Sequence, residues 1–287
     1  CAVDGMCATA CPVGINTGDL VRRLRSTTRR GLERVAWNAA ASRWRLTTFM
    51  AAFAMNVADR LPTRLVQVAT DAARMALGAD TVPRYSADLP RGGRRRGTDQ
   101  AGPTDAEPVA VYFPSCVGSM FAPAARPGVE SALRTLCERA GVAMRLPQGI
   151  RSMCCGTPWK SKGHLEGYGR MRDAVLPALT TASGAGALPI VSDGASCSEG
   201  LVVMAATSEV PLVITDLVVF AREVLLPRLE VVRRFGSIAV HPTCSTEHLG
   251  ATAALVVLAR AIADEVVVPE SWGCCGFAGD RGMLHPE

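Results

Sequence analysis

Two cysteine motifs each occur twice in this chain, in the same order, and this repeat constrains the fold more than any other feature of the sequence. A strand-like run followed by proline, a hydroxyl residue and cysteine occurs as VAVYFPSC, ending at Cys116, and as IAVHPTC, ending at Cys244. A Cys-Cys-Gly turn follows each run, at residues 154–156 and 274–276. Repetition of a unit within one chain is typical of a structure built from similar parts. We therefore expect two α/β halves, each with a cysteine at a strand end and a cysteine pair in a loop.

Short apolar strands alternate with amphipathic helices through both halves, which we place at residues 108–230 and 231–287. The expected strands are 108–113, 142–147, 188–193, 237–242 and 264–270, and the expected helices are 128–141, 167–182, 215–229 and 251–263. Such alternation predicts a parallel or mixed sheet with both faces covered. Ligands of open α/β sheets bind at the carboxyl ends of the strands. The cysteines that follow these strands are therefore expected to converge.

The first 107 residues lack this alternation and divide into three regions. We expect a cysteine-bearing segment over residues 1–29, a helical region over residues 30–82 and a flexible linker over residues 83–107. The linker is rich in Gly, Pro, Arg and Asp and has no apolar periodicity, which is typical of a mobile connection.

Helices follow the N-terminal cysteines. Asn16 or Thr17 can cap the first helix, and further helices are expected over residues 31–59 and 62–78. The most apolar stretch of this part is residues 46–58, which is too short to span a bilayer. We expect that stretch to be a buried core helix.

Eleven cysteines are many for a chain of 287 residues. Disulfide frameworks belong mostly to small secreted domains, and no signal peptide is visible. Ten of the cysteines fall in short clusters or beside Gly, Pro and Ser turns. This pattern favours metal ligation in a reducing, cytoplasmic compartment, with peripheral attachment to the inner face of the membrane as an alternative. The remaining one, Cys137, occupies an apolar helix position and is assigned to core packing.

The first half supplies four candidate ligands, Cys116, Cys154, Cys155 and Cys197. Adjacent cysteines in an extended backbone point to opposite sides, which suits a single tetrahedral zinc ion poorly. An iron–sulfur cluster is larger and takes thiolates at separate irons. Gly156 would allow a positive φ and a close approach of the backbone. We favour an iron–sulfur cluster over zinc and over a metal-free thiol or disulfide site.

The second half offers Cys244, Cys274 and Cys275 as metal ligands, with Gly276 in the place of the first glycine. Three cysteines are weaker evidence for a metal site than the four of the first half, and a fourth ligand can lie beyond Glu287. Because the chain also begins inside a cysteine run, we expect it to be a segment of a longer protein.

The N-terminal sequence CAVDGMCATACP fits the bacterial ferredoxin spacing C-x2-C-x2-C-x3-C-P at Cys1, Cys7, Cys11 and Pro12. Asp4 stands where that pattern has its second cysteine. Asp4 can ligate iron, or the site can carry a 3Fe-4S cluster with no protein ligand at that corner, or an outside ligand can complete a 4Fe-4S cluster. All three interpretations remain open from the sequence.

Charged residues follow the Cys-Cys-Gly turns. Lys160, Lys162 and His164 follow the first turn, and Arg281 follows the second. They can tune the potential of a cluster or contact an anionic substrate, and ordinary loop charge is the alternative.

Charge is spread unevenly along the chain. The first 100 residues hold 16 arginines and 8 acidic residues. This excess can face an acidic partner or anionic lipid, although a solvated helical surface explains it as well. Almost all basic residues are Arg, which we attribute to coding bias, and we expect no nucleic-acid partner.

The motif pair resembles the cysteine-rich CCG domain of heterodisulfide reductase subunits, of the anaerobic glycerol-3-phosphate dehydrogenase C subunit and of lactate-utilisation proteins. The order of a ferredoxin-like run, helices, linker and paired CCG repeats is most similar to the C-terminal half of FAD- and iron–sulfur-dependent D-lactate (D-2-hydroxyacid) dehydrogenases of the actinobacterial type. The fold implied is a helical ferredoxin-like segment followed by a tandem-repeat α/β cysteine-rich domain, an α+β or α/β arrangement.

The resemblance implies the iron–sulfur portion of an oxidoreductase. In that family a flavin domain precedes this region, so the resemblance implies that FAD is bound upstream. No G-x-G-x-x-G or P-loop occurs in this sequence. Electrons would pass onward to a quinone or cytochrome-type acceptor. The full CCG motif ends in C-x2-C, whereas this chain keeps only Cys197 and has Gly194 at the earlier position. A four-cysteine site is therefore the most that residues 116–197 support.

Two alternatives to this function stay open. One is a heterodisulfide-reductase-like subunit that performs thiol–disulfide chemistry at the CCG cysteines. The other is a membrane-anchor subunit resembling the glycerol-3-phosphate dehydrogenase C subunit, with lipid binding by residues 31–78. The hydroxyacid is not fixed by these residues, and the fragment alone is not expected to be active.

Overall fold

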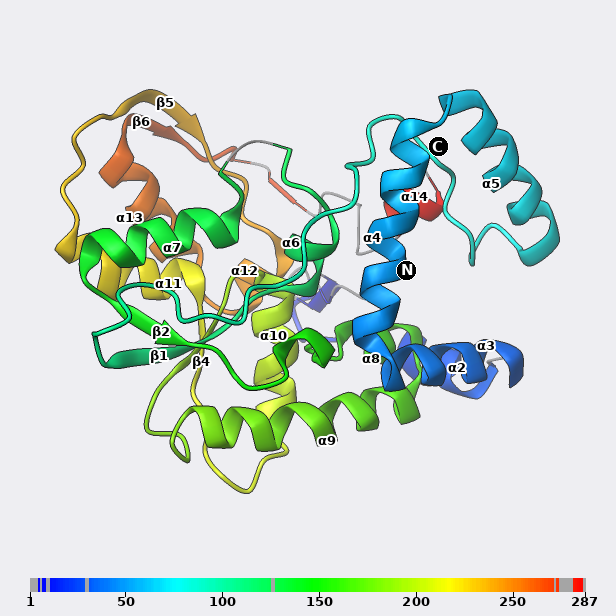
Figure 1. Cartoon of the computed structure of the whole chain (residues 1–287), viewed down its shortest axis with the longest axis horizontal. Helices are drawn as coiled ribbons and strands as arrows, with labels where there is room; N and C mark the ends of the chain where they lie inside the picture. The colour runs from blue at the N-terminus through cyan, green and yellow to red at the C-terminus, as the bar shows by residue number, and fades with distance from the viewer. Residues whose placement is uncertain are drawn as a thin grey trace.

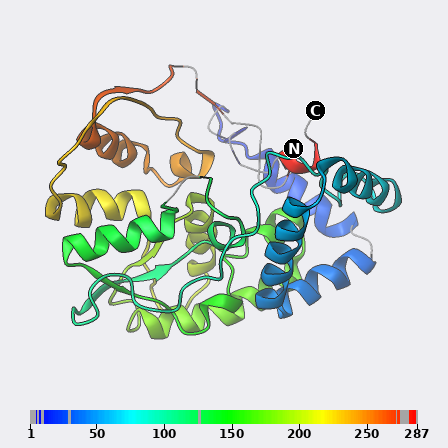
Figure 2. The ribbon, with the colours of Figure 1, turned by 45° about the horizontal axis from the view of Figure 1, so that its top comes forward.

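The structure of the protein is a computed structural model. It describes residues 5, 7–8, 11–28, 31–124, 127–270, 272–273 and 281–285, without the side chains of residues 28, 32 and 281. Figures 1 and 2 show helices α4 (Trp44–Arg60) and α5 (Thr63–Leu77) at one end of the molecule, and the small unit of strands β5 (Phe235–Ala239) and β6 (Ala263–Val267) at the other.

A four-stranded parallel sheet lies at the centre of the fold. Its strands are β1 (Pro108–Phe113), β2 (Ala143–Arg145), β3 (Ile190–Ser192) and β4 (Ile214–Asp216), in the order β2-β1-β3-β4. Val111 of β1 pairs with Arg145 on one side and with Ile190 on the other. The sequence prediction of an α/β fold with parallel strands is therefore confirmed for this part of the chain.

The two faces of the central sheet build two hydrophobic clusters, because successive side chains of a strand point to opposite faces. Val111 and Phe113 pack in one cluster with α9 (Leu165–Ala182) and α10 (Ala195–Ala205). Ala110 and Tyr112 pack in the other with α7 (Val129–Ala140) and α11 (Leu217–Phe220). The core includes Cys137, which is fully buried as predicted.

Short elements complete the first half. They are α6 (Cys116–Met120), η1 (Ile150–Ser152), α8 (Thr157–Lys162), the π-helical turn η2 (Ala221–Leu225) and η3 (Leu226–Arg228). The helix expected over residues 215–229 is thus divided, with β4 at its start and Pro227 within its last turn.

A second, two-stranded parallel sheet is formed by β5 (Phe235–Ala239) and β6 (Ala263–Val267). Between these strands lie α12 (Cys244–His248) and α13 (Thr252–Ile262). The order strand, short helix, long helix, strand also describes β1, α6, α7 and β2. In both units the short helix begins at the cysteine, after a hydroxyl residue that caps it, Ser115 or Thr243.

Among the described residues, the N-terminal part contains the helices α2 (Thr17–Thr28), α3 (Gly31–Ser42), α4 (Trp44–Arg60) and α5 (Thr63–Leu77). The single helix expected over residues 31–59 is broken at Arg43, because α3 packs against α9 whereas α4 packs against α6 and η1. The short helix α14 (Arg281–Leu284) packs beside α5, where Arg74 donates a hydrogen bond to the Leu284 carbonyl.

The apolar stretch in α4 is not a buried core helix, and that expectation was wrong. Trp44 is the buried residue of α4, whereas Phe49, Met50 and Phe53 are exposed. The helix contacts its neighbours along one side, and its remaining apolar side chains face outward. In the part of the chain that the structure describes, no helix has both the length and the apolarity needed to cross a membrane.

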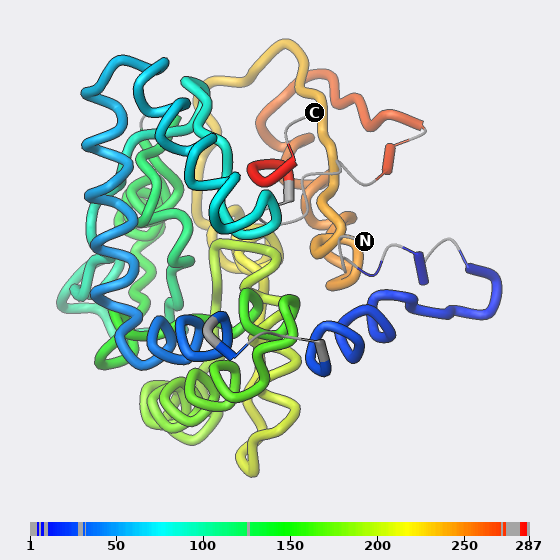
Figure 3. Tube along the Cα trace, turned by 90° about the vertical axis from the view of Figure 1, so that its right-hand side faces the viewer, coloured from blue at the N-terminus to red at the C-terminus, as the bar shows by residue number. Residues whose placement is uncertain are grey.

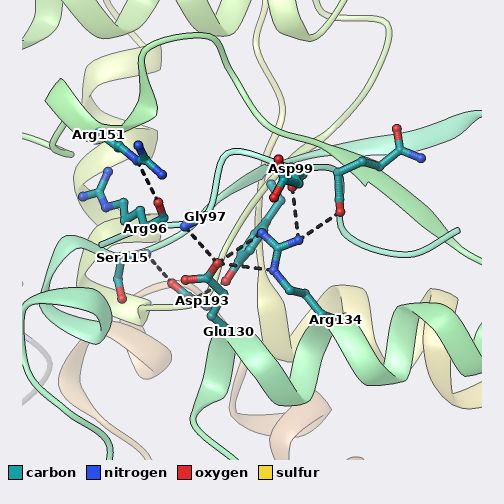
Figure 4. A network of polar contacts seen from close by, with 10 residues as sticks. Arg96, Gly97, Asp99, Ser115, Glu130, Arg134, Arg151 and Asp193 are labelled. Atoms are coloured by element: carbon teal, nitrogen blue, oxygen red, sulfur yellow. Dashed lines mark hydrogen bonds and ion pairs between the residues drawn. The ribbon is translucent and has the colours of Figure 1, made fainter. Parts of the chain in front are cut away.

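The expected flexible linker is irregular but packed. Arg96 is buried and donates hydrogen bonds to the carbonyls of Ile150 and Met153. Glu130 of α7 accepts a hydrogen bond from the Gly97 amide and pairs with Arg134, whose guanidinium binds the carbonyl of Asp99 (Figure 4). Long-range polar contacts therefore fix a segment that has no apolar periodicity.

Candidate functional site

Four cysteines from separate parts of the chain gather at the carboxyl ends of β1 and β3. Cys116 begins α6, Cys154 and Cys155 lie in the loop before α8, and Cys197 lies in the first turn of α10. None is more than 6% exposed. The structure therefore brings together all four cysteines that the sequence proposed for the first half, at the sheet edge where α/β folds bind ligands.

The four thiols form a row of contacts. The Sγ atoms of Cys116 and Cys154 are 3.9 Å apart. The Cys154 thiol also bonds with Cys155, and the Cys155 thiol bonds with Cys197. Cys154 and Cys155 were expected to point to opposite sides. Their thiols instead interact with each other, and the chain turns at Gly156 directly after the pair.

Hydrogen bonding among the four thiols lowers the pKa of some of them and raises the pKa of others. The pKa of Cys155 is held well below its usual value, because Cys154, Cys197 and Thr157 all bond to its sulfur. The pKa values of Cys154 and Cys197 are raised, because each donates to a neighbouring sulfur and is buried. Cys155 is thus the position at which the site favours a thiolate.

A hydroxyl group and a cationic group lie beside two of the four thiols. The Thr157 hydroxyl lies 3.3 Å from the Cys155 sulfur. The pKa of Cys116 is lowered, first by its bond with Cys154 and then by the nearby positive charge of Arg96. These contacts stabilise negative sulfur in a site from which water is largely excluded.

The turn that carries the cysteine pair requires glycine. Gly156 has φ +80°, as predicted, and a Cβ there would lie 2.7 Å from the Tyr168 ring. Gly200 of α10 also approaches closely, since a Cβ there would lie 2.3 Å from the Thr157 hydroxyl. Gly276 of the second turn lies outside the described residues.

The donor set suits an iron–sulfur cluster in its chemistry, since buried thiolates are the usual ligands of such clusters. Within the described parts of the chain, no group of three or more His, Cys, Asp or Glu side chains is arranged to hold a single metal ion.

The basic residues after the first turn divide between two environments. Lys160 lines a cavity of about 280 Å³ beside α10, where burial and then Arg22 lower its pKa. Lys162 and His164 instead contact the Trp37 ring of α3, at 5.7 and 5.0 Å from its centre. The side chain of Arg281 lies outside the described part, and its helix α14 packs beside α5.

Two N-terminal cysteines are described, and both are partly buried. Thr17 donates a hydrogen bond to the Cys7 sulfur at 3.2 Å and lowers its pKa. The pKa of Cys11 is lowered by the backbone amides of residues 13–15. Cys1 and Asp4, which complete the predicted ligand run, lie outside the described residues.

The N-terminal segment and the helix of Cys244 meet at the same cavity. Gly5 and Ala8 line it together with His248 of α12 and Glu199 of α10. In Figure 3 the first described residues, in dark blue, lie beside the orange segment that contains α12. Cys244, the first residue of α12, is partly buried, whereas its predicted co-ligands Cys274 and Cys275 lie outside the described residues.

Glu199 joins the two cysteine-bearing helices, and the sequence reasoning did not identify it. Its carboxylate accepts a hydrogen bond from Ser245 at 2.6 Å and lies 3.2 Å from the His248 ring. Arg96 was missed as well, because it lies in an arginine run that was interpreted as linker. In the sequence, Glu199 is marked only by its position, two residues after the candidate ligand Cys197 and five after Gly194.

Residues 110–201 match the family model of the CCG cysteine-rich domain. The matched segment contains the four thiols of the row. A CCG domain is thus present in this chain, and it indicates an iron–sulfur redox role. Comparison with curated proteins and with solved structures gives no match.

Proposed function

We propose that this chain is the iron–sulfur electron-transfer portion of a flavin-linked D-lactate or D-2-hydroxyacid dehydrogenase. FAD would be bound upstream, and the electrons would go to a quinone or a cytochrome-type acceptor. The presence of a CCG domain supports the redox role. The hydroxyacid and the flavin domain rest on the resemblance of the motifs and their order.

The observation that carries the proposal is the buried row of Cys116, Cys154, Cys155 and Cys197. These four residues would hold the cluster, which when bound supplies one-electron transfer. The protein's own contribution is visible in the structure: Arg96 places positive charge near Cys116, and the Thr157 hydroxyl bonds to Cys155. Such contacts to ligand sulfur set the properties of a bound cluster.

Two further sets of cluster ligands would extend the path of electron transfer through the protein. Cys7 and Cys11 lie among hydroxyl and amide donors, which suits thiolate ligands. With Cys1, and with Asp4 or an outside ligand at the fourth corner, they would form an N-terminal site. Cys244 would belong to a third site with Cys274 and Cys275.

The test uses the full-length protein, including its upstream domain, purified without oxygen. Iron, acid-labile sulfide and flavin are measured, and EPR spectra are recorded before and after addition of D-lactate. We expect a cluster signal that appears or changes on addition of substrate. D-2-hydroxyglutarate and glycolate serve as competing substrates. Protein that contains flavin but no iron or sulfide would contradict the proposal.

A second function, thiol–disulfide exchange, is favoured by the direct thiol contacts. A low-pKa thiol at Cys155 next to Cys154 is the arrangement that activates a cysteine as a nucleophile. In that reaction the Cys155 thiolate would attack a substrate disulfide, release one substrate thiolate, and be resolved by a neighbouring thiol as a protein disulfide forms. Iron-free protein that reduces a disulfide substrate stoichiometrically would establish this function instead of the first.

A further inference from the structure

A cavity of about 550 Å³ lies between α4, residues 93–96, the end of α6 and η1. We call it the arginine pocket after the arginines that line it, which are Arg43, Arg45, Arg94, Arg95, Arg96 and Arg151. None of the described residues lining it is acidic. The pocket is therefore strongly cationic.

The charge of this pocket is not balanced by neighbouring carboxylates. Elsewhere arginines pair with acids, as Arg134 does with Glu130 and Arg234 with Asp264. Among the residues that the structure describes, no ion pair involves any of the six pocket arginines.

A buried donor of the pocket lacks an acceptor in the described structure. It is the indole Nε1 of Trp44, whose side chain lines the cavity and is more than nine-tenths buried. Buried donors are nearly always hydrogen-bonded in folded proteins. An unpaired donor in a cationic cavity points to a ligand with acceptor oxygens.

The pocket is held in place by backbone contacts. Arg96 donates to the carbonyls of Ile150 and Met153, and Arg151 donates to the carbonyl of Arg96 (Figure 4). The adjoining chain packs so closely on α4 that a Cβ at Gly92 would lie 1.8 Å from the Ala52 carbonyl oxygen. Arg96 and Arg151 are thus fixed at the wall of the cavity, and such preorganisation favours binding.

We propose that the arginine pocket binds a phosphate group. Guanidinium forks match phosphate oxygens in geometry and charge, and a multiply charged anion relieves the repulsion among the arginines. Exposed Phe49 and Phe53 at the same cavity can contact an apolar body attached to the phosphate. The phosphate can come from a soluble compound or from an anionic lipid headgroup. This inference is independent of the redox function proposed above.

The test measures binding of the whole chain to each source of phosphate at constant ionic strength. Inorganic phosphate is titrated by calorimetry, and phosphatidylcholine vesicles with and without phosphatidic acid are used for co-sedimentation. The pocket variant is Arg94→Gln with Arg95→Gln, since both side chains are exposed and their loss spares the core. The control is Arg139→Gln with Arg233→Gln, two exposed arginines outside the pocket, which changes the net charge equally.

We expect the pocket variant to bind about 25-fold more weakly than wild type, since each of the two arginines it loses contributes roughly a factor of five. The control variant should bind within about twofold of wild type. Binding of free phosphate identifies a soluble ligand, and binding only to phosphatidic acid vesicles identifies a lipid. No binding in either arm, or equal weakening by both double variants, would overturn the proposal.

Discussion

The Sγ atoms of Cys116 and Cys154 lie 3.9 Å apart although 38 residues separate them in the chain. The contact exists because Cys116 begins a helix at the end of β1, while the loop from β2 returns to the same edge of the sheet. Closing a loop of this length costs conformational entropy. The folded sheet, and not the thiols themselves, must therefore hold the two sulfurs together.

Loss of Cys155 should abolish cluster binding at the CCG site. In Cys155→Ser, the sulfur that three neighbours stabilise as a thiolate is replaced by a hydroxyl that stays protonated. We expect iron and sulfide per chain to fall by the content of one cluster, with loss of the matching absorbance. Cys137→Ala is the matched control, since that cysteine lies in the core beside Met144. Unchanged iron in Cys155→Ser would show that this thiol is not a ligand.

Gly156→Ala should destabilise the cysteine loop. The new Cβ would meet the Tyr168 ring at 2.7 Å, and the positive φ is unfavourable for alanine. We expect a loss of about 2 kcal/mol or more in unfolding free energy, together with lower iron incorporation. Gly169→Ala provides the comparison, because nothing lies within 4 Å of its Cβ position in α9. That variant should be neutral or slightly stabilising, by up to about 1 kcal/mol.

The strands and the meeting of the thiols could be predicted because both follow from local pattern. Residues 108–113 form β1 as expected, since a strand buried on both faces is a continuous apolar run. Cys116 and Cys197 come together because each follows a parallel strand, and the carboxyl ends of parallel strands lie at the same edge of the sheet. These features depend on the sequence within each strand or helix, and only a little on which distant segments pack against it.

The burial of Arg96 and the exposure of Phe49 could not be predicted in this way. Arg96 is buried because the carbonyls of Ile150 and Met153, more than 50 residues away, accept its hydrogen bonds. Phe49 lies in an apolar run that resembles a core helix, yet α4 has packing partners on only part of its surface. In both cases the outcome depends on the neighbours that the fold supplies, and local periodicity does not carry that information.

Glu199→Gln should loosen the contact between α10 and α12. The carboxylate accepts a hydrogen bond from Ser245 and lies beside His248, and an amide keeps the size but removes the charge. Because Glu199 is partly exposed, we expect a modest loss of about 1 kcal/mol. Hydrogen exchange of the α12 amides should become faster. Glu209→Gln, at an exposed site away from α12, should leave the exchange of α12 unchanged.

Cys137 should make the stability of the fold sensitive to alkaline pH. The side chain is fully buried, and burial raises the pKa of its thiol to about 11 from an ordinary value of 9.0. Between these values the unfolded thiol loses its proton while the folded thiol keeps it, so the unfolded state binds fewer protons. The free energy of unfolding therefore falls as the pH rises through this window. The loss amounts to about 2 to 3 kcal/mol.

Urea unfolding of wild type and Cys137→Ala between pH 7 and pH 11, under reducing conditions, measures this effect. At pH 7 the variant should be less stable by about 1 to 2 kcal/mol, because the sulfur no longer fills its site against Met144. The difference should shrink above pH 9 and change sign before pH 11, since alanine cannot ionise. Leu133→Ala, also buried in α7, should instead show a pH-independent loss. A constant gap between wild type and Cys137→Ala would mean that the buried thiol does not contribute to the alkaline loss of stability.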